Sequence, residues 1–555
     1  MNNNKKSLII IIVILAIICL TGILYFTIFK KDSNDENTST SISESVSNNN
    51  EMDVNIDWSS YEKYSINLDS DNTSITKAGV YTITGTLKNG SITINTSDNV
   101  KLILDNVSIT NSSGPAINVE NAKNVYINLV GNNKIVSTTT EELDGAIYSK
   151  DNLLIEGDGT LNLTSNYDGI VSKDDLVVNS GTLNIITSDD GIRGKDSITI
   201  NDGNISITSD GDGIKTTNEE EKGSITIIDG NINITSKGDA IDSISTLKIS
   251  GGTFNLKTSN TDTTISTKGI KAASNMVIEN GTFTINTTDD ALHSNASISI
   301  TNGTFELSSG DDGIHADDKL IIDNGTINII KSYEGIEATD ITINDGTINI
   351  KASDDGVNVS GGNDTGGNGR MDMFASTDGY LTINGGNVSV NADGDGLDSN
   401  GSIKITGGTI YVDGPTNSGN GALDYNGTME ITGGTLIAVG SSGMSQNATS
   451  ANQVSVLINL SNYYSDEFTF GGITYKPSKQ YNSIIISSSK LETGKSYDLE
   501  IGGEVVTTVE VTDNVTNSGN GGMQGGPGGG MMRGNQNGGN NQDMQSGQRR
   551  GMRQN

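Results

Sequence analysis

Apolar and polar residues alternate over most of the chain, and this pattern recurs about every 22 residues. Two successive units are Asp174–Lys195 (DDLVVNSGTLNIITSDDGIRGK) and Asp196–Thr217 (DSITINDGNISITSDGDGIKTT). Each unit has an alternating stretch, then a Gly with a second alternating stretch, then an acidic-Gly-Ile turn with a short third stretch. Because a strand places successive side chains on opposite faces, a period of two predicts half-buried strands and not helices.

Three short strands in a unit of about 22 residues predict the coil of a parallel β-helix. The crossover rule for parallel strands predicts right-handed winding. Leucine-rich repeats have a similar length, but they require a fixed Leu pattern that this chain lacks. We therefore expect an all-β fold with the β-helix over residues 53–453.

One apolar residue anchors the third stretch of each unit, and these anchors should stack in the interior. The predicted anchor column is Ile147, Ile170, Ile192, Ile214, Ile241, Ile270, Leu292, Ile314, Ile336, Val357, Leu397 and Leu423. Small residues stand two positions later and should fit a narrow corner; they include Ser172, Gly194, Ser243, Ala272, Ser294, Ala316 and Ala338. Departures from the period are insertions, chiefly within 215–222, 259–267, 358–379 and 414–421.

The period ends near residue 454, and short strands separated by turn signals follow. An exposed last coil would present an unpaired strand edge. We expect residues 454–515 to form a small β domain or cap over that edge. The tail, residues 516–555, is rich in Gly, Asn, Gln and Met and is predicted to be disordered.

The N-terminal segment has a different character. Residues 8–29 are almost entirely apolar and lie between two pairs of lysines, Lys5–Lys6 and Lys30–Lys31. This length can span a bilayer as a helix. We predict a signal anchor over 1–31, a disordered acidic spacer over 32–52, and a single-pass membrane protein whose bulk is extracellular. A cleaved signal peptide is the alternative.

Charge and cysteine content exclude several classes of protein. The chain has 34 Lys and Arg against 68 Asp and Glu, a formal net charge of −34. This balance argues against nucleic-acid binding, which draws its affinity from basic residues. The single cysteine, Cys19, lies in the apolar segment and excludes a disulfide framework and a Cys-based metal site.

An acidic column should run beside the anchors. The residues two before the anchor are Asp168, Asp190, Asp212, Asp239, Asp290, Asp312, Glu334, Asp355 and Asp395. Adjacent carboxylates about 4.8 Å apart would repel by roughly 1 kcal/mol per pair in water. Oxygen-rich flexible turns suit Ca²⁺, so the predicted metal ligands are Asp168, Asp189, Asp190, Asp210, Asp212, Asp289, Asp290, Asp311, Asp312, Asp354, Asp355 and Asp395. The alternative is that Asp-Gly simply favours the turn backbone.

A second column, one residue after the anchor, should face outward. It holds Arg193, Lys215, Asp242, Lys271, His293, His315, Glu337, Asn358, Asp398 and Asp424. Its basic members have two interpretations: they neutralise the acids, or they bind carbohydrate. The candidates for binding are Arg193, Lys215, Lys271, His293 and His315. Five tyrosines near these turns could stack on sugars or simply pack: Tyr148, Tyr167, Tyr333, Tyr411 and Tyr425.

The repeat, its DGI turns and its GTLNI-type strands resemble the carbohydrate-binding domain family of bacterial surface proteins, a right-handed parallel β-helix related in shape to pectate lyases. The resemblance covers roughly residues 53–515. It implies calcium-associated, non-catalytic binding of plant cell-wall polysaccharides such as cellulose and polygalacturonate. It also implies calcium ligands in the acidic turns, such as Asp189–Asp190, Asp311–Asp312 and Asp354–Asp355.

Three functions compete at this point: an anchored polysaccharide-binding protein, a calcium-dependent pectate-lyase-like enzyme, and a structural or adhesive surface rod. A lyase would need a basic residue beside the metal, and Arg193 or Lys215 are the candidates. Nearly every coil repeats the same turn, however, whereas a catalytic site should be a single irregular constellation. We therefore expect binding without catalysis and name no catalytic residue.

Overall fold

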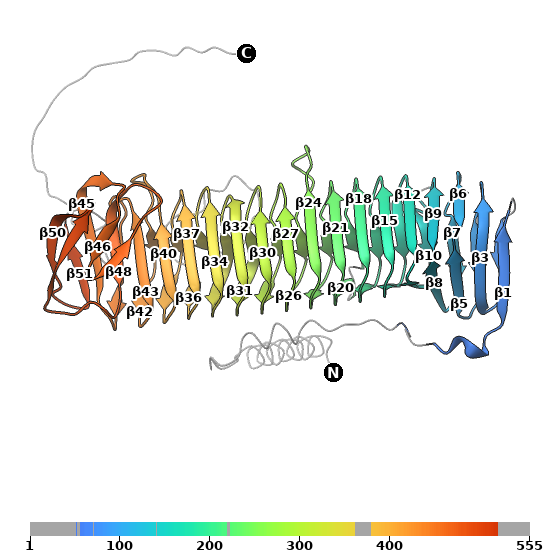
Figure 1. Ribbon diagram of the computed structural model, residues 1–555, viewed down its shortest axis with the longest axis horizontal. Coiled ribbons are helices and arrows are strands. Elements are labelled where there is room, and N and C mark those ends of the chain that lie inside the picture. The colour runs from blue at the N-terminus through green and yellow to red at the C-terminus, as the bar shows by residue number, and fades with distance from the viewer. Residues whose placement is uncertain are drawn as a thin grey trace, which may run out of the picture.

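The computed structural model describes residues 52, 56–69, 72–139, 141–218, 222–360 and 379–519. This part of the chain is all-β, and its short strands stack side by side into an elongated rod with mainly parallel pairing (Figure 1). The helical content within these ranges is one 3₁₀ turn, η1 (Trp58–Ser60). The coiled, parallel arrangement agrees with a β-helix, and right-handed winding stays a prediction.

The first strands of successive coils pair in parallel and form one long face of the rod. In chain order they are β1 (Lys63–Leu68), β3 (Gly79–Leu87), β5 (Val100–Asp105), β8 (Asn124–Val130), β11 (Asn152–Gly157), β14 (Asp175–Val178), β17 (Ser197–Ile200), β20 (Ser224–Ile227), β23 (Leu247–Ile249), β26 (Met276–Ile278), β29 (Ser297–Ile300), β31 (Ile314–Ile322), β33 (Ile336–Ile343), β36 (Tyr380–Ile383), β39 (Ser402–Ile405), β42 (Met429–Ile431) and β44 (Ser450–Ala451).

The second strands form another face, and from β9 onward they begin just after the repeated glycine of each unit. They are β6 (Ser108–Asn111), β9 (Asn132–Ser137), β12 (Thr160–Ser165), β15 (Thr182–Thr187), β18 (Asn204–Ser209), β21 (Asn231–Ser236), β24 (Thr253–Thr258), β27 (Thr282–Asn286), β30 (Thr304–Ser308), β32 (Thr326–Ser332), β34 (Thr347–Ala352), β37 (Asn387–Ala392), β40 (Thr409–Asp413) and β43 (Thr435–Gly440).

The third strands are the shortest, and they carry the predicted anchors. They are β2 (Thr73–Ile75), β4 (Ile92–Asn95), β7 (Ile117–Asn121), β10 (Gly145–Ser149), β13 (Asp168–Ser172), β16 (Ile192–Gly194), β19 (Ile214–Thr216), β22 (Ile241–Ser243), β25 (Ile270–Ala272), β28 (Leu292–Ser294), β35 (Val357–Val359), β38 (Leu397–Ser399) and β41 (Leu423–Tyr425). In two coils the third and first strands run together as β31 and β33.

The register confirms the anchor column. Each anchor from Ile147 to Leu397 pairs with the anchor of the next coil, the last being Leu423, and all twelve are fully buried. The small residues two positions later are buried as well. One such hydroxyl, Ser172 Oγ, donates to the carbonyl oxygen of Asp175 at 3.0 Å, which satisfies a polar group at the corner.

A stack of aromatic rings fills the middle of the interior. Phe254, Phe283 and Phe305 come from β24, β27 and β30, and neighbouring ring centroids are 4.6 Å apart with nearly parallel planes. The turns before these strands need glycine: Gly281 has a φ of 141°, and an added Cβ there would lie 2.8 Å from the Phe283 ring. The repeated glycine therefore leaves room for the core as well as turning the chain.

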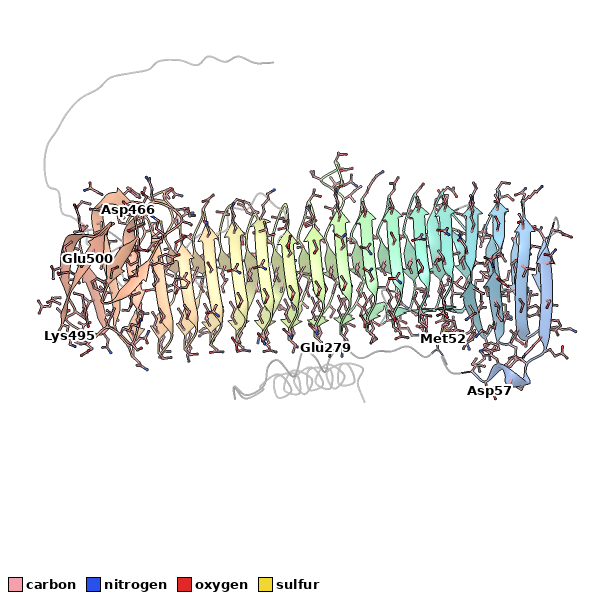
Figure 2. All side chains as sticks on the ribbon, viewed as in Figure 1. Met52, Asp57, Glu279, Asp466, Lys495 and Glu500 are labelled. Atoms are coloured by element: carbon pink, nitrogen blue, oxygen red, sulfur yellow. The ribbon has the colours of Figure 1, made fainter. Side chains whose placement is uncertain are left out.

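Residues 454–519 close the rod at its C-terminal end. The strand β48 (Tyr481–Ser487) pairs antiparallel with β43 and with β45 (Ser455–Tyr464), and β51 (Val515–Ser518) pairs with β45. A separate four-stranded sheet contains β46 (Phe468–Phe470), β47 (Ile473–Tyr475), β49 (Ser496–Ile501) and β50 (Glu504–Glu510). Figure 2 places Asp466, Lys495 and Glu500 at this end. The pairing with β48 covers the strand edge that the last coil would otherwise expose.

The start of the described chain lies against the outside of the first coils. Trp58 packs on Tyr61 and Tyr126, and Met52 joins Tyr126 and Leu154 in a small apolar cluster. Figure 2 places Met52 and Asp57 along that flank of the rod. No helix in the described ranges has the length and apolarity needed to cross a membrane. The predicted anchor over 1–31, nearly all of the predicted spacer, and residues 520–555 of the predicted tail lie outside the described residues.

Candidate functional site

The acidic column forms a hydrogen-bonded ladder at the corner between the second and third strands. In most coils the backbone N–H at the ladder position donates to the carboxylate Oδ1 of the ladder residue in the preceding coil. Asp190 N lies 3.0 Å from Asp168 Oδ1, Asp212 N lies 2.8 Å from Asp190 Oδ1, and Asp239 N lies 2.6 Å from Asp212 Oδ1. One oxygen of each carboxylate thus satisfies the turn backbone, which supports the alternative that Asp is chosen for the turn.

The same ladder continues into the later coils. Asp312 N donates to Asp290 Oδ1 at 3.0 Å, and Glu334 N donates to Asp312 Oδ1 at 3.2 Å. Asp395 N donates to Asp355 Oδ1 at 2.6 Å. The pattern explains why a short carboxylate recurs two residues before the anchor, because its oxygen reaches one coil along the rod.

Basic side chains occupy the second oxygen over the first part of the ladder. Lys215 Nζ lies 2.5 Å from Asp212 Oδ2, and Lys271 Nζ lies 3.2 Å from Asp239 Oδ2. Arg193 Nη2 lies 2.7 Å from Asp168 Oδ2 and also pairs with Asp144. These predicted carbohydrate-binding residues therefore form ion pairs with acidic ladder residues, most of which were predicted as metal ligands, and neutralise their charge.

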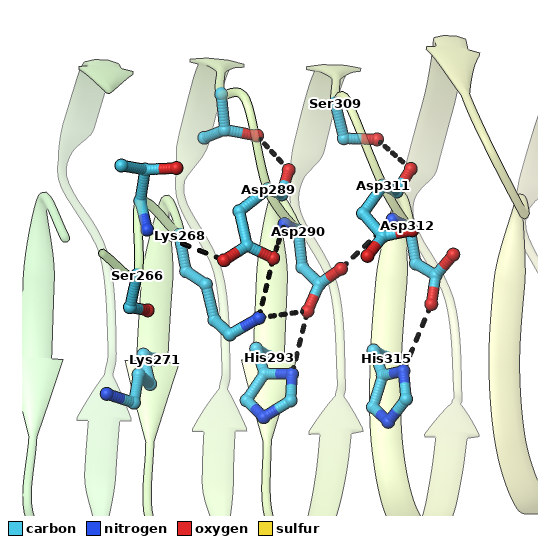
Figure 3. A network of polar contacts seen from close by, with 12 residues as sticks. Ser266, Lys268, Lys271, Asp289, Asp290, His293, Ser309, Asp311, Asp312 and His315 are labelled. Atoms are coloured by element: carbon cyan, nitrogen blue, oxygen red, sulfur yellow. Dashed lines mark hydrogen bonds and ion pairs between the residues drawn. The ribbon is translucent and has the colours of Figure 1, made fainter. Parts of the chain in front are cut away.

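Lys268 is the strongest example of this neutralisation. Its ammonium group lies 2.7 Å from Asp289 Oδ1 and 2.6 Å from Asp290 Oδ2 (Figure 3). Its side chain is only 14% exposed. Lys268 stands two residues before Ile270, where most coils carry the ladder acid, and its amine enters the acidic pair of the next coil. Asp144, which pairs with Arg193, was missed, because its own coil has Gly145 at the ladder position.

The outward column is more buried than expected, and for His315 the predicted exposed position is wrong. Its side chain is 1% exposed, with Nδ1 3.0 Å from Asp312 Oδ2 and 3.1 Å from Glu337 Oε2, and Nε2 3.2 Å from Asp317 Oδ1. Burial lowers the pKa of His315, but the hydrogen bonds to Asp312 and Glu337 outweigh it and raise that pKa to about 11. The ring is therefore a buried cation, because closely stacked coils leave little room beside the ladder.

The two histidines stack in adjacent coils. Their ring centroids are 4.9 Å apart, and His293 Nδ1 lies 2.8 Å from Asp290 Oδ2 (Figure 3). Oxygen and nitrogen atoms of Asp290, His293 and His315 come within 4.8 Å of one another, but the Lys268 amine already contacts Asp290. A second cation there would meet that positive charge directly.

The second acids of the doubled turns lie further out than the ladder. Asp189 and Asp311 are exposed, and Asp289 and Asp354 are half-buried. Asp210 is also exposed and pairs with Lys237 at 2.6 Å. These carboxylates can meet solvent or a bound polymer, and their role as metal ligands stays a prediction.

The C-terminal part of the ladder has a different electrostatic character. Asp395, Asp398 and Asp424 each place a carboxylate oxygen within 4.8 Å of the others. Within the described residues, no Lys, Arg or His forms an ion pair with them or with Asp355. Burial, followed by repulsion from neighbouring carboxylates, raises the pKa of Asp398 to about 8, and burial raises the pKa of Asp395 to about 7. A bound cation would remove this repulsion.

A polar groove lies at the other end of the second strands. Its volume is about 320 Å³, and it crosses the turns that precede β30, β32, β34 and β37. It is lined by Asn280, Asn302, Gly303, Thr304, Asn324, Gly325, Thr326, Asp345, Gly346, Thr347 and Asn387. Amides and hydroxyls with glycines between them give a nearly uncharged surface that can hydrogen-bond to hydroxyl groups.

Raised carboxyl pKa values in the first part of the ladder predict a pH effect on stability. Burial raises the pKa of Asp168 to about 7 and that of Asp190 to about 6. Between about pH 4 and 7 the folded protein then holds protons that the unfolded chain has lost, so the free energy of unfolding should fall as pH rises. Melting temperatures in EDTA from pH 4 to 8 should decline over that window, and Asp168→Asn should flatten the decline. A melting temperature that rises across the window would contradict the burial argument.

Comparison with known proteins shows which family the chain belongs to. The profile of the family described as "Carbohydrate-binding domain-containing protein" matches residues 69–313 and 311–526, which is most of the chain. The chain belongs to this family of carbohydrate-binding domain-containing proteins. The matches include every coil that carries the ladder and the groove. Carbohydrate binding in general therefore follows from family membership.

Two individual proteins are similar to parts of the chain. A "Carbohydrate-binding domain-containing protein" of Acetivibrio thermocellus is 32% identical over 117 residues, which cover 19% of this chain and 41% of that relative. A solved structure described as the polysaccharide lyase-like protein from C. thermocellum, a gadolinium derivative, is 32% identical, with a TM-score of 0.35. That match covers 37% of this chain and 87% of the other. The chain thus matches less than half the length of the first of these relatives.

Proposed function

We propose that this chain is a membrane-anchored extracellular protein that binds plant cell-wall polysaccharides, such as cellulose or polygalacturonate, with the help of calcium and without cleaving them. Membership of the carbohydrate-binding family carries the proposal. Residues 8–29 would hold the protein in the membrane, because their apolar length suits a bilayer. The second acids of the doubled turns, which lie further out than the ladder along the same corner of the rod, would provide the calcium-dependent contact.

The state of the two candidate bases favours binding over catalysis. A lyase base must accept a proton, so it needs a neutral form near the working pH. Burial lowers the pKa of Arg193 and of Lys215, but Asp168 and Asp144 raise that of Arg193, and Asp212 and Asp190 raise that of Lys215, with a net increase for both. Both side chains therefore remain protonated cations. A lyase is the second candidate, since one similar structure is described as polysaccharide lyase-like.

The two surfaces suit different polymers. A polyuronate carries one carboxylate per sugar and would need cations between itself and the outer acids of the ladder corner, such as the exposed Asp311 and the half-buried Asp354. A neutral glucan offers only hydroxyl groups, which match the amides and hydroxyls of the groove, such as Asn302 and Thr326. The proposal thus assigns acidic glycans to the ladder corner and neutral glycans to the groove.

A depletion assay tests the proposal. The purified chain in detergent is mixed with cellulose, polygalacturonate or xylan, in Ca²⁺ or in EDTA, and the protein left in solution is measured. We expect retention on at least one polymer, and we expect EDTA to release the protein from polygalacturonate. Asp311→Asn with Asp354→Asn should weaken retention on polygalacturonate alone, and Thr304→Glu with Thr326→Glu should weaken retention on cellulose alone.

The control is the outer face of the second strands. Asn349 Nδ2 donates to Asn328 Oδ1 at 2.7 Å on this face, and neither residue lines the groove or belongs to the ladder. Asn328→Ala with Asn349→Ala should leave retention unchanged, and a loss there would place the binding surface on that face. No retention on any polymer would remove the proposed function and favour a structural rod. Unsaturated product that disappears in Lys215→Ala would establish the lyase instead.

A further inference from the structure

A column of side chains on the outer face of the first strands is buried, although it points away from the interior. Backbone pairing stacks this outer column coil by coil from Val177 on β14 to Ile321 on β31. Met276 and Ile278, on either side of Val277, belong to the main core, so alternation along the strand turns Val277 outward. Val277 is nevertheless 1% exposed and Ile321 2%, and they form an apolar cluster with no other described member. An outward side chain on a sheet face is buried only where another segment lies over it, so the outer column has a cover.

The cover ends near β31. Beyond Ile321 the outer column continues through Thr342 and Thr382, which are half-buried, to Lys404, which is exposed. The covered part also includes the buried Thr199, Thr226 and Ser299 and the half-buried Lys248. The covering segment therefore follows the outer column for several coils and then leaves it.

The start of the described chain already lies on the same column. Trp58 packs on Tyr126 with ring centroids 5.0 Å apart, and Met52 joins Tyr126 and Val177 in one apolar cluster. Tyr126 belongs to the outer column two coils before Val177. Met52 lies nearer the middle of the rod than Asp57 does (Figure 2). The chain that precedes Met52 therefore begins at the first coil of the covered part.

We propose that the spacer before Met52, residues 32–51, lies extended along the outer column and is its cover. Its apolar residues are Val46 and Ile42, and the rest of it is polar or acidic. An extended chain turns every second side chain to the same side. Ile56 and Met52 pack on the rod four residues apart, and Val46 and Ile42 continue the same even spacing. The spacer can thus place its two apolar residues on the face that Met52 already touches.

The length of the spacer agrees with the length of the covered part. Val46 lies six residues before Met52, which is about 20 Å of extended chain. Four coil steps of about 4.8 Å lead from Val177 to Val277, or about 19 Å. Four further residues of spacer, about 13 Å, match the two coil steps, about 10 Å, to Ile321. The cover then ends where the apolar residues of the spacer end.

Such a cover fixes the orientation of the rod at a membrane. The ladder corner lies between the second and third strands, so it is opposite the face of the first strands. With the spacer on that face, the chain leads away to residues 8–29 near the middle of the rod and not at its end. The first-strand face would then lie toward the bilayer and the ladder corner away from it. This orientation alone rests on the proposed function, because it requires residues 8–29 to be in a membrane.

Alkylation of a single cysteine tests the cover. The full chain in detergent carries Cys19→Ser, and one new cysteine is placed on the outer column. Val277→Cys should react with a maleimide about tenfold more slowly than Thr382→Cys, which lies on the same column beyond the cover. The rate is measured by intact mass.

Charges in the spacer should remove this protection. Ile42→Asp with Val46→Asp should raise the reaction rate of Val277→Cys to that of Thr382→Cys, because unpaired carboxylates are costly to bury against apolar side chains. The matched control is Ser43→Asp with Ser47→Asp, which adds the same charge on the opposite side of an extended spacer. That control should leave Val277→Cys protected.

Each outcome supports or overturns the cover. Equal rates for Val277→Cys and Thr382→Cys would overturn it, as would loss of protection in both aspartate variants. Protection that survives Ile42→Asp with Val46→Asp would overturn it too; it would assign the face to a second copy if it rises with protein concentration, and to detergent or another segment if it does not. Circular dichroism should stay unchanged in every variant, because none of these side chains lies in the interior. Since no glycan is present, loss of the cover and loss of the proposed function are separate results.

Discussion

Replacing Lys268 by Met is expected to lower the free energy of unfolding by about 3–5 kcal/mol, the usual result of removing one partner from a buried ion pair. Its ammonium group lies 2.7 Å from Asp289 Oδ1 and 2.6 Å from Asp290 Oδ2, with 14% of the side chain exposed. Without it, two adjacent carboxylates would keep their charge in a site with little water. Chemical denaturation followed by circular dichroism measures the change.

The control for this variant is Lys257→Met, in the same region of the rod. Lys257 is exposed on the outer side of β24, so its replacement should change stability by no more than about 0.5 kcal/mol. Burial raises the pKa of Asp290, but His293 and Lys268 outweigh it and hold that pKa well below its usual value. The stabilisation is then present above about pH 4 and fades at lower pH, where wild type and Lys268→Met should converge. Equal effects of the two lysine variants would contradict the importance of the ion pair.

Replacing Phe283 by Ala is expected to cost a similar amount, about 3–5 kcal/mol, because it opens a cavity in a closely packed core. Phe283 is 1% exposed and lies between Phe254 and Phe305, with both centroid distances 4.6 Å. Its loss removes two stacking contacts, each worth about 0.5–1.5 kcal/mol beyond the burial of area. The same denaturation measurement gives the change.

Ile186 provides the comparison, since it also lies on a second strand but points outward. Its side chain is 58% exposed on β15, so Ile186→Ala should alter the free energy of unfolding by less than about 0.5 kcal/mol. A small effect of Phe283→Ala would mean that neighbouring coils close the cavity, and the aromatic stack would then contribute little to stability.

Much of the fold could be predicted because a coil repeats one simple rule. Once the unit length is known, each residue must stack on its equivalent in the next coil, and the observed pairing of Ile170 with Ile192 and of Ile192 with Ile214 follows. The ladder position of Asp190 and Asp212 was predictable for the same reason. The hydrogen bond that this position makes was not predictable, because spacing alone does not tell which donor a carboxylate oxygen accepts from. Here the oxygen accepts from the backbone N–H of the next coil.

The exposed or buried state of the neighbouring column was harder to predict. Alternation gives the direction in which His315 leaves the strand, but not how closely Asp312 and Asp317 of its own coil and Glu337 of the next coil surround it. Lys268 occupies the ladder position, where its N–H donates to Asp239 Oδ1, and its long side chain reaches the acidic pair of the next coil. Such contacts depend on how far each side chain reaches in space, and the repeat period does not specify this.

The sequence by itself determined the all-β character, the coil length, the residues that fill the interior and the corner that carries the acids. These features follow from a period of two residues within strands and of about 22 residues between coils. Backbone hydrogen bonds between successive coils then place equivalent residues in columns. Only the tertiary structure decided the charge balance along the ladder: Arg193 pairs with Asp144, 49 residues away, whereas Asp398 and Asp424 have no described cationic partner. Electrostatic interaction depends on distances in space, and in this protein those distances join side chains from different coils, which the repeat period does not specify.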